Sequence, residues 1–575
     1  MYILNEMELK IKNNINEILK KHNVKFEVNL EKPLDSTMGD FSLPCFQFSK
    51  IFKKPPEEIA NIIKSEIKKE KIIKKIKGKN GYLNFFLDEK IIIQKTLENI
   101  LKNMEKYGYH TKKNKKIIIE HTSANPNGPL HVGRARNPII GDTLVRLGKA
   151  SGYNIISQFY LDDMGKQVAI LYWGLKNLDP DQVLKSNRKK PDHESVAYYQ
   201  KSVELMNKNE KNSNEIQNIV KKSEKGDKKT LEEIKKAYEP VLKGINESLK
   251  FINITLDHYI PESNFIKDKS VDAVIIKLNN SKYSKKEDKA RYIEMENFGI
   301  KGRNTKFYYL RKDGTTLYAT RDIAYHIWKA KNSDIMINIL GEDHRLESKQ
   351  VEIALKIFGE KKIPKIVFYS FVSLPEGKMS TRKARVVYLD DLIDEAIDRA
   401  YKEVKKRRGN ELSEKKMKEI SKIVGTGSIR FNIIKVQPEK SITFKWEEAL
   451  NFEGNSAPFI QYAYARSCSI LSKAKNLNIK INPDFIKENS ETNLVRKFAE
   501  YPNIIIKSFE ESKPHLLANY LLEFSSVFNQ FYRDCPVLSI NNQDIKKSRL
   551  FLVKATKTIL KNGLNLLGIN APDEM

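Results

Sequence analysis

A loop rich in hydrogen-bond donors and small residues, 121–137, follows a short β-branched run at 117–120. The run is typical of a buried strand, and the polar, glycine- and proline-containing stretch after it is typical of a loop. Residues 155–161 favour a second strand. Between the two strands, apolar residues recur at helical spacing: Ile140, Leu144 and Leu147. The order of strand, loop, helix and strand predicts a βαβ unit.

The donors at this loop predict a phosphate site. In a βαβ unit, the first loop and the N-terminus of its helix attract anions, because unpaired backbone N–H groups and the helix dipole both point there. His131, Arg134 and Arg136 lie at this end of the helix. A basic helix start that contacts only solvent is the alternative, and charge alone does not separate the two interpretations.

A second group of cations lies at 377–385, shortly after a strand expected at 366–371. Ser380 lies among four cations within eight positions: Lys378, Arg382, Lys383 and Arg385. Such a segment can surround a polyphosphate and compensate charge as it develops. By itself it is more often a solvated basic loop. Together with the His131 loop on another strand of the same sheet, it indicates a nucleotide site.

A chain of 575 residues is too long for one hydrophobic core and should form several domains. We expect an N-terminal α+β domain at 1–110, a parallel-sheet α/β domain at 111–375, a connecting helical region with the second cationic loop at 376–455, and an all-α bundle at 456–575. Residues 176–250 are rich in Lys, Glu, Asn and Ser. This composition predicts an exposed helical insertion with solvated charges.

Hydrophobic patterns predict the remaining elements. In the N-terminal domain we expect helices at 7–20 and 56–69 and a strand at 81–87. Strands that continue the central sheet are expected at 307–310, 335–340 and 366–371. Bundle helices are expected at 457–474, 494–512, 515–533 and 546–564. The third of them carries an apolar stripe typical of a bundle core: Leu516, Tyr520, Phe524 and Phe528.

The net charge of +30 is spread over the domains rather than held in one tail. A distributed basic field suits a long polyanion such as RNA, although a Lys-, Ile- and Asn-rich codon bias explains part of it. No apolar run reaches the length of a membrane span, and no secretory signal is apparent, so we expect a cytoplasmic protein. Cys45, Cys468 and Cys535 lack metal-ligand spacing, and we expect no bound metal.

Five blocks together resemble one known family. HVGR and KMS resemble the paired signature motifs of class I aminoacyl-tRNA synthetases. The longer blocks resemble archaeal-type arginyl-tRNA synthetases, in family order: EHTSANPNGPLHVGRARNPIIGD, TLYATRDIAYH, GKMSTRK with VVYLDDLIDEA, EGNSAPFIQYAYARSCSIL and GLNLLGINAPDEM. The similarity extends from about residue 38 to the C-terminus.

The resemblance implies a Rossmann-type catalytic domain, an N-terminal domain that contacts tRNA and a helical anticodon-binding domain. It implies formation of arginyl-adenylate from arginine and ATP, with Mg²⁺ accompanying the nucleotide as a substrate complex. Arginine then passes to the 2′-hydroxyl of the terminal adenosine of its tRNA. Family members typically need bound tRNA for the first step and work as monomers.

The resemblance also assigns site residues for ATP. The predicted ATP-binding residues are Pro129, His131, Gly133, Arg134, Asn137, Lys378, Met379 and Ser380. Those expected to act in catalysis are His131, Gly133, Arg134, Lys378 and Ser380. They would stabilise the crowded α-phosphorus during in-line attack by the arginine carboxylate.

Recognition of arginine requires a carboxylate, because a guanidinium is always charged and must be paired when it is desolvated. Tyr318 and Asp322 are four residues apart at a helix start, so both can meet one guanidinium. The family resemblance implies an arginine site formed by Glu120, Ser123, Asn125, Tyr318, Asp322 and Gln350. The structural alternative for Asp322 is an ordinary acid at the N-terminus of a helix. For tRNA bases we predict stacking and clamping by Tyr462, Tyr464, Arg466 and Arg533.

Three positions depart from the family pattern. Arg134 replaces the usual final histidine of the first motif, Thr381 replaces the lysine of the second, and Ala384 replaces a common glycine. A synthetase for another amino acid, such as cysteine or glutamine, is one alternative function. Cysteine recognition in this class uses zinc, and no suitable cysteine cluster exists here. A synthetase-like RNA-binding protein without catalysis is the other alternative.

Overall fold

The computed structural model describes residues 2–24, 26–33, 35–301, 305–373, 387–474 and 481–575. Its centre is a five-stranded parallel sheet with the order β11-β10-β4-β5-β6. The strands are β4 (Lys116–Glu120), β5 (Asn154–Leu161), β6 (His258–Pro261), β10 (Ile335–Gly341) and β11 (Lys365–Tyr369). Helices cover both faces of such a sheet, which explains why β4 is an almost unbroken apolar run.

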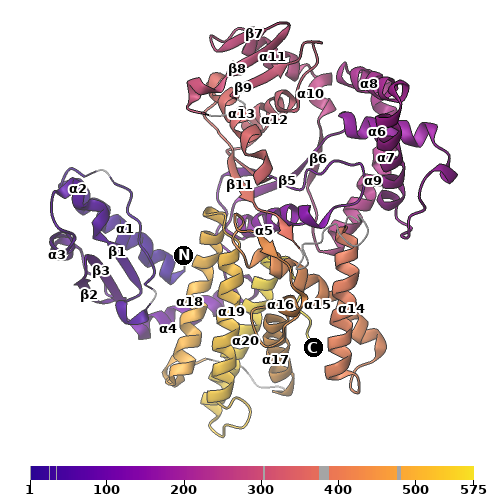
Figure 1. Cartoon of the computed structure of the whole chain (residues 1–575). Helices are drawn as coiled ribbons and strands as arrows, with labels where there is room; N and C mark the ends of the chain where they lie inside the picture. Colours follow the sequence, from indigo (N-terminus) through magenta and orange to yellow (C-terminus); the bar gives the residue numbers. More distant parts are fainter. Residues whose placement is uncertain (1, 25, 34, 302–304, 374–386, 475–480) are drawn as a thin grey trace.

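The predicted βαβ unit is confirmed. β4 pairs with β5 in parallel, with Ile118 opposite Ile156. The connecting helix α5 (Arg136–Ala150) is buried on nearly all sides, since it lies between the sheet and the C-terminal helices (Figure 1). The parallel-sheet fold class predicted from the sequence is therefore correct.

The region predicted as an exposed insertion, 176–250, is helical but is not simply exposed. Together with α6 (Lys166–Asn177) it forms the crossover from β5 to β6, through α7 (Pro191–Lys208), α8 (Glu210–Glu224) and α9 (Lys228–Phe251). The side chains of Ile234, Val241 and Ile245 on α9 are fully buried in the main core. The charged composition of the region concealed this face, although its apolar residues recur every three or four positions along the 24-residue helix.

The strand predicted at 307–310 exists but belongs to a different sheet. β9 (Lys306–Leu310) forms an antiparallel sheet with β7 (Ser284–Glu287) and β8 (Ala290–Glu294). This sheet lies above the parallel sheet, as seen in Figure 1. Helices in this part are α10 (Ser263–Lys267), α11 (Ser270–Asn279), α12 (Tyr318–Asn332) and α13 (Arg345–Ile357). The strand predicted at 366–371 ends at Tyr369.

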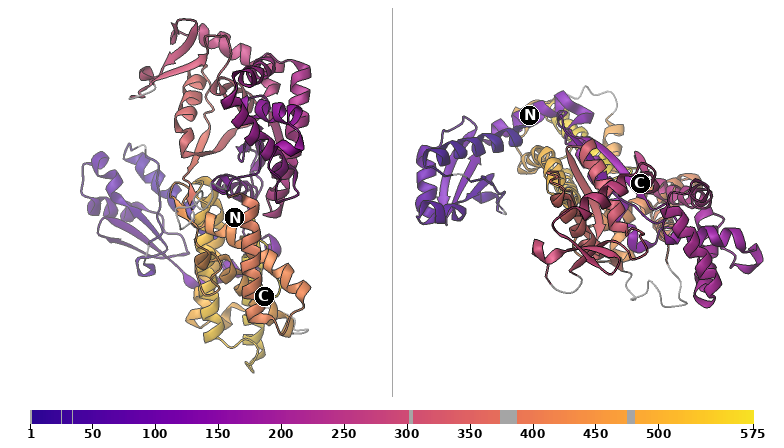
Figure 2. Two further views of the ribbon diagram at one scale, coloured as in Figure 1. Left: turned by 45° about the vertical axis from the view of Figure 1, so that its right-hand side comes forward. Right: turned by 90° about the horizontal axis from the view of Figure 1, so that it is seen from above.

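The N-terminal part is a small α+β lobe (Figure 2). Its strands, β1 (Phe41–Pro44), β2 (Ile73–Lys79) and β3 (Tyr82–Leu87), pair antiparallel in the order β1-β3-β2. Its helices are α1 (Ile3–Lys21), α2 (Ser49–Phe52) and α3 (Pro56–Glu66), and α4 (Glu89–Asn103) leads to the rest of the chain. Both predicted helices and the predicted strand are present. Arg496 joins this lobe to the bundle through Asp40 and Glu89 at 3.0 and 2.9 Å.

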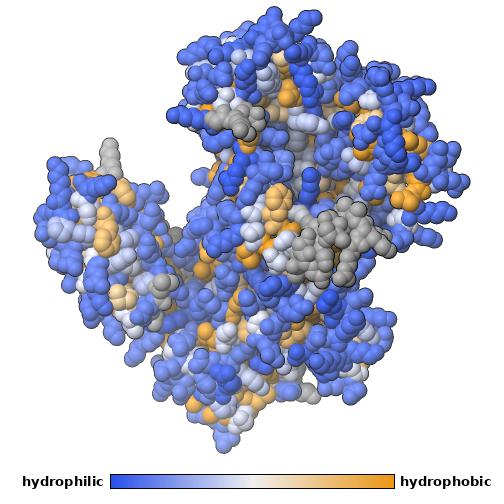
Figure 3. Space-filling model, in the orientation of Figure 1, coloured by the Kyte–Doolittle hydropathy of each residue, from blue (hydrophilic) through white to orange (hydrophobic). Residues whose placement is uncertain are grey.

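The described residues of 456–575 form helices and no strand, as predicted for the bundle. The bundle helices are α17 (Ala457–Lys473), α18 (Asn489–Glu510), α19 (His515–Asp534) and α20 (Gln543–Leu566). Connecting elements are β12 (Val372–Ser373), α14 (Leu389–Arg408), α15 (Glu414–Ile434), β13 (Ile442–Thr443) and α16 (Trp446–Ala449). Tyr520, Phe524 and Phe528 are buried. The face drawn in Figure 3 is mostly hydrophilic. Within the described ranges, no helix has the length and hydropathy needed to span a bilayer.

Candidate active site

The loops after β4 and β10 meet at one point of the sheet. From β4 the chain moves outward to β5 and β6, and it later adds β10 and β11 on the other side of β4. In open α/β sheets a change of direction of this kind marks the crevice in which ligands bind, and here that position lies beyond the carboxyl ends of β4 and β10. Glu120 ends β4, and the 3-10 turn η7 (Glu342–His344) follows β10.

His131 lies at the edge of this crevice with a defined proton position. It precedes the short 3-10 turn η4 (Val132–Arg134), and its Nδ1 accepts a 3.0 Å hydrogen bond from the backbone N–H of Gly133. Burial lowers the pKa of His131, and nearby Arg134 lowers it further. The neutral ring therefore carries its proton on Nε2, which remains a donor. The Gly133 N–H is already used by His131, so its predicted direct contact with a phosphate finds no support here.

The remaining predicted ATP residues of this loop differ in exposure. Arg134 is exposed, and Pro129 is half-buried. Arg136 is fully buried and donates to the carbonyl oxygens of Ser370 and Lys440 at 2.7 and 2.6 Å. Our sequence interpretation placed Arg136 at the phosphate, and this was wrong. Its guanidinium instead fastens α5 to the segments that follow β11 and α15.

Asn137 is also engaged within the protein. Its side-chain oxygen accepts from the backbone N–H of Thr122 at 2.6 Å, and its amide nitrogen donates to the carbonyl of Ile339 at 2.8 Å. Thr122 and Ser123 both have positive φ, at 71° and 38°. Asn137 thus holds a strained turn against β10, and a direct contact with ATP finds no support in this geometry.

The second cationic loop, with Lys378, Met379 and Ser380, lies outside the described residues. The segments on either side of it are placed next to the first loop. The N–H of Val132 donates to the Val387 carbonyl at 3.1 Å, and the N–H of Leu389 donates to the Leu130 carbonyl at 2.7 Å. On the other side, β12 packs against η4. Both ends of the second loop therefore meet the His131 loop.

Tyr318 and Asp322 occupy the first turns of α12, which points its N-terminus at the crevice. The Asp322 side chain is 32% exposed, and its Oδ1 lies 3.1 Å from Nδ1 of His326. Burial raises the pKa of Asp322, but His326, Lys329 and His344 outweigh this effect and lower the pKa overall. The carboxylate is consequently ionised at neutral pH and partly open to a ligand.

The Tyr318 ring is 46% exposed, and one of its faces is already covered. The Arg321 guanidinium lies 4.9 Å from the ring centroid. Arg321 is itself buried and pairs with Glu262, Nε to Oε2, at 3.0 Å. A ligand guanidinium can therefore reach only the exposed part of the Tyr318 ring, beside Asp322.

Glu120, Ser123 and Asn125 lie in or directly before the turn after β4. Glu120 is buried and ion-paired with Lys329 of α12 at 2.6 Å, while Ser123 donates to its other oxygen at 3.3 Å. Its charge is therefore balanced inside the protein, and a ligand meets a hydrogen-bond acceptor rather than a free anion. Asn125 is half-buried in the same turn.

Gln350 lies on α13, more than one turn beyond its start. His344, at the end of η7, is closer to the crevice. Its charge acts on Asp322, and the charge of Arg134 acts on it. His344 thus lies between the predicted nucleotide loop and the predicted arginine carboxylate. Its hydrogen bond to Glu347 raises the pKa of His344 despite partial burial.

Four polar residues near this site were not predicted: His326, Lys329, Asn338 and His344. His326 and Lys329 follow Asp322 by four and seven residues, so the helical period places all three on one side of α12. The sequence signal that could have revealed them is a histidine and a lysine at helical spacing from an acid, on a helix whose other residues are largely apolar.

One group in the described part of the chain has ligand atoms close enough to hold a metal: Asp192, His193 and Asp390. The Lys190 ammonium, however, lies 3.1 Å from Asp192 and 2.8 Å from Asp390. Although burial raises the pKa of Asp390, His193 and Lys190 hold it well below its usual range. The group is thus an internally compensated ion cluster that joins α7 to the start of α14.

The predicted base-stacking residues lie mostly on the bundle surface. The Arg466 guanidinium lies 4.8 Å from the ring centroid of Tyr462 and 5.3 Å from that of Tyr532, and the two rings are 42% and 43% exposed. These residues line a hollow of about 580 Å³. Arg533 is exposed. Tyr464 is buried and donates a 2.7 Å hydrogen bond to Asp573, so the prediction that Tyr464 stacks on a base is wrong.

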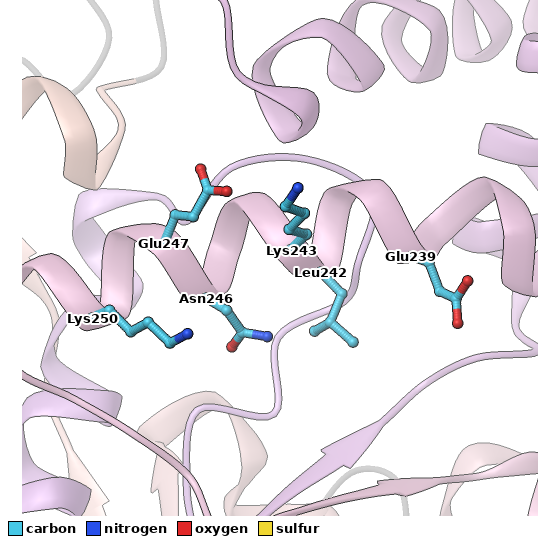
Figure 4. Close-up of a pocket in the computed structure, with 6 residues that line it drawn as sticks. All are labelled: Glu239, Leu242, Lys243, Asn246, Glu247 and Lys250. Atoms are coloured by element: carbon cyan, nitrogen blue, oxygen red, sulfur yellow. The ribbon is translucent and has the colours of Figure 1, made fainter.

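A further hollow of about 420 Å³ lies along α9. Figure 4 shows that its six lining side chains all come from this helix, among them Glu239, Lys243 and Glu247. It contains none of the predicted site residues. Because the side chains that line it carry mixed charges and lie on one exposed helix face, we interpret this hollow as an ordinary irregularity of the protein surface.

Comparison with known proteins identifies the family. The model of the class I tRNA synthetase (R) catalytic domain matches residues 96–446, the arginyl-tRNA synthetase N-terminal domain matches 5–87, and the DALR anticodon-binding domain matches 460–575. The arginine–tRNA ligase of Methanocella arvoryzae is 46% identical over 93% of each chain. This chain belongs to the arginyl-tRNA synthetase family.

Other members of the arginyl-tRNA synthetase family support this assignment. The arginine–tRNA ligase of Methanocaldococcus jannaschii is 40% identical over 99% of this chain and 100% of its own. The solved arginyl-tRNA synthetase of Thermus thermophilus has the same fold, with a TM-score of 0.86 at 24% identity, over 99% of this chain and 100% of that one. That of Plasmodium falciparum gives 0.79 at 20% identity, over 99% of both chains. The family resemblance inferred from the sequence is confirmed.

Proposed function

We propose that this protein is an arginine–tRNA ligase. It activates L-arginine with ATP, which arrives as its Mg²⁺ complex, to form arginyl-adenylate, and it transfers arginine to the 2′-hydroxyl of the terminal adenosine of its tRNA. The observation that carries the proposal is the ionised, partly open Asp322 carboxylate at the switch point of the sheet, beside Tyr318. Membership of the arginyl-tRNA synthetase family supports it independently.

ATP binds at the His131 loop in this proposal. The neutral His131 ring directs its Nε2–H outward, and exposed Arg134 adds a permanent positive charge. Lys378 and Ser380 would complete the site from the second loop, whose ends meet the first. These donors stabilise negative charge that develops on the phosphate during in-line attack by the arginine carboxylate.

Arginine binds with its guanidinium against Asp322 and the open part of the Tyr318 ring. Pairing with a carboxylate is required because a guanidinium keeps its charge when it loses water. Glu120, Ser123 and Asn125, at the adjacent turn, form hydrogen bonds with the backbone and side-chain groups of arginine, and their oxygens accept from its α-ammonium, which can only donate. We keep Gln350 as a more distant contact on α13.

We further propose that tRNA contacts both the N-terminal lobe and the bundle. Arg466, between two exposed tyrosine rings, offers a stacking surface for unpaired bases, and Arg533 adds a nearby positive charge. We propose that the protein acts as a cytoplasmic monomer and that tRNA must be bound before arginine is activated.

An amino-acid-dependent exchange of pyrophosphate into ATP tests the function. We expect exchange with arginine alone among the standard amino acids, and only when arginine tRNA is present. Exchange with cysteine or glutamine would contradict the choice of substrate. Binding of tRNA without any exchange would instead indicate the RNA-binding alternative.

The histidine of the first loop offers a second test. His131→Asn keeps an acceptor where Nδ1 lies, so the Gly133 N–H remains satisfied, but it removes the outward Nε2–H. We expect kcat of exchange to fall by about 100-fold, as for loss of one preorganised donor to a transition state. The thermal midpoint and the KM for arginine should stay unchanged. A large loss of thermal stability with little loss of kcat would show that His131 only shapes the loop.

A further inference from the structure

A continuous chain of buried polar groups joins the two acids of the proposed arginine site. Lys329 Nζ lies 2.6 Å from Glu120 Oε2 and 2.9 Å from Asn338 Oδ1. The amide nitrogen of Asn338 lies 2.7 Å from His326 Nε2. Nδ1 of His326 then lies 3.1 Å from Asp322 Oδ1 and 2.8 Å from the Asp322 carbonyl oxygen. The chain runs from β4 through α12 and β10 to the mouth of the crevice.

The position of every proton in this chain follows from which side-chain atoms can donate a hydrogen bond and which can accept one. The Lys329 ammonium has no lone pair and can only donate, so it must meet the oxygen of the Asn338 amide. The nitrogen of that amide then faces His326 and can only donate as well. Nε2 of His326 must therefore accept, which leaves the single ring proton on Nδ1, directed at Asp322. A doubly protonated ring would place N–H against N–H.

The distribution of charge follows from these protons. Lys329 and Glu120 neutralise each other, and the exposed fraction of the Lys329 side chain is zero. His326 is 2% exposed, and the Asn338 amide donor at its Nε2 leaves room for a single ring proton. Asp322 thus receives a hydrogen bond but has no adjacent ion-pair partner among the residues that the structure describes, while its own side chain is 32% exposed. Within this described part of the site one cation is lacking, at the point where a ligand can supply it.

We propose that Lys329, Asn338 and His326 are positioning residues: the first two keep His326 neutral, so that Asp322 has no charged partner among the described residues and is selective for a cationic side chain. This inference rests on the proposed function and adds to it the source of the charge specificity. Lys329 acts through Asn338 on the tautomer of His326, and the guanidinium of arginine takes the place that an imidazolium would otherwise fill.

Asn338→Asp tests the proposal with almost no change of volume. A carboxylate at 338 accepts from Nε2, so His326 becomes protonated between two acids and neutralises Asp322. We expect the KM for arginine to rise by about tenfold or more, while inhibition by citrulline, the neutral isostere, is unchanged or stronger. The preference for arginine over citrulline, measured in tRNA-dependent exchange, should therefore collapse. The KM for ATP should not change.

Two further variants complete the test. Asn84→Asp makes the same substitution at another buried amide, in β3 of the N-terminal lobe, and should leave the arginine-to-citrulline preference intact. His326→Asn keeps a permanently neutral donor toward Asp322 and should retain most of the preference. An Asn338→Asp variant that loses arginine and citrulline binding equally would show that the chain is only structural, and would overturn the proposal.

The unmodified protein provides a readout that does not depend on the folding of any variant. With ¹⁵N-labelled histidine, we expect the His326 ring, identified by its loss in His326→Asn, to be the neutral Nδ1–H form at pH 7 without substrate. A doubly protonated ring there would overturn the proposal even if arginine exchange is normal. Absence of arginine exchange in the unmodified protein would refute the proposed function instead, and the ring signal would still decide the tautomer.

Discussion

Asp322→Asn should raise the KM for arginine by about 100- to 1000-fold. The substitution keeps the shape of the side chain and a hydrogen-bond acceptor, but it removes the negative charge opposite the guanidinium. Loss of one partner from a desolvated ion pair costs about 3–5 kcal/mol, and 1.4 kcal/mol corresponds to tenfold in affinity. The arginine dependence of tRNA-stimulated pyrophosphate exchange measures this effect.

The control is Asp398→Asn, which removes the same charge from an exposed position on α14. It should not alter the KM for arginine, and neither variant should change the KM for ATP. An unchanged arginine KM in Asp322→Asn would mean that the carboxylate serves only to begin α12. The proposed recognition of arginine would then have to be abandoned.

Arg430→Met should destabilise the whole molecule by about 3 kcal/mol or more. The buried Arg430 guanidinium donates to the carbonyls of Leu567 and Ile252 at 2.8 and 2.9 Å and to Asp142 at 2.6 Å. It therefore ties α15 and α5 to the end of α9 and to the C-terminal segment. Its removal leaves two buried carbonyls without donors and weakens the pairing of a buried carboxylate. Denaturant unfolding followed by circular dichroism measures the loss.

Lys418→Met is the matched control for Arg430→Met, because Lys418 lies on the same helix in an exposed pair with Glu414 at 3.3 Å. Exposed pairs contribute about 0–1 kcal/mol, so its effect on unfolding should be small. Equal effects of the two substitutions would show that the Arg430 contacts add little beyond an ordinary surface charge.

Local sequence patterns determined much of this protein. The β-branched run before the first loop, the helical spacing of Ile140 and Leu144 and the apolar stripe of the bundle predicted their elements correctly, because side-chain period reports burial directly. The signature segments predicted the family correctly, and the Tyr318–Asp322 spacing predicts the position of the arginine site. These features are all contained within short stretches of chain.

Tertiary structure alone decided which partner each buried group has. Arg136 and Asn137 carry the right chemistry for a phosphate, but their donors face carbonyls of segments about 200 to 300 residues away. Glu120 meets Lys329 because β4 pairs with β10, and β10 packs against α12. β9 joins a separate sheet although its sequence suits the central one. Periodicity states that a side chain is buried, whereas its partner depends on how distant elements pack. The charge left open at Asp322 is a property of that packing.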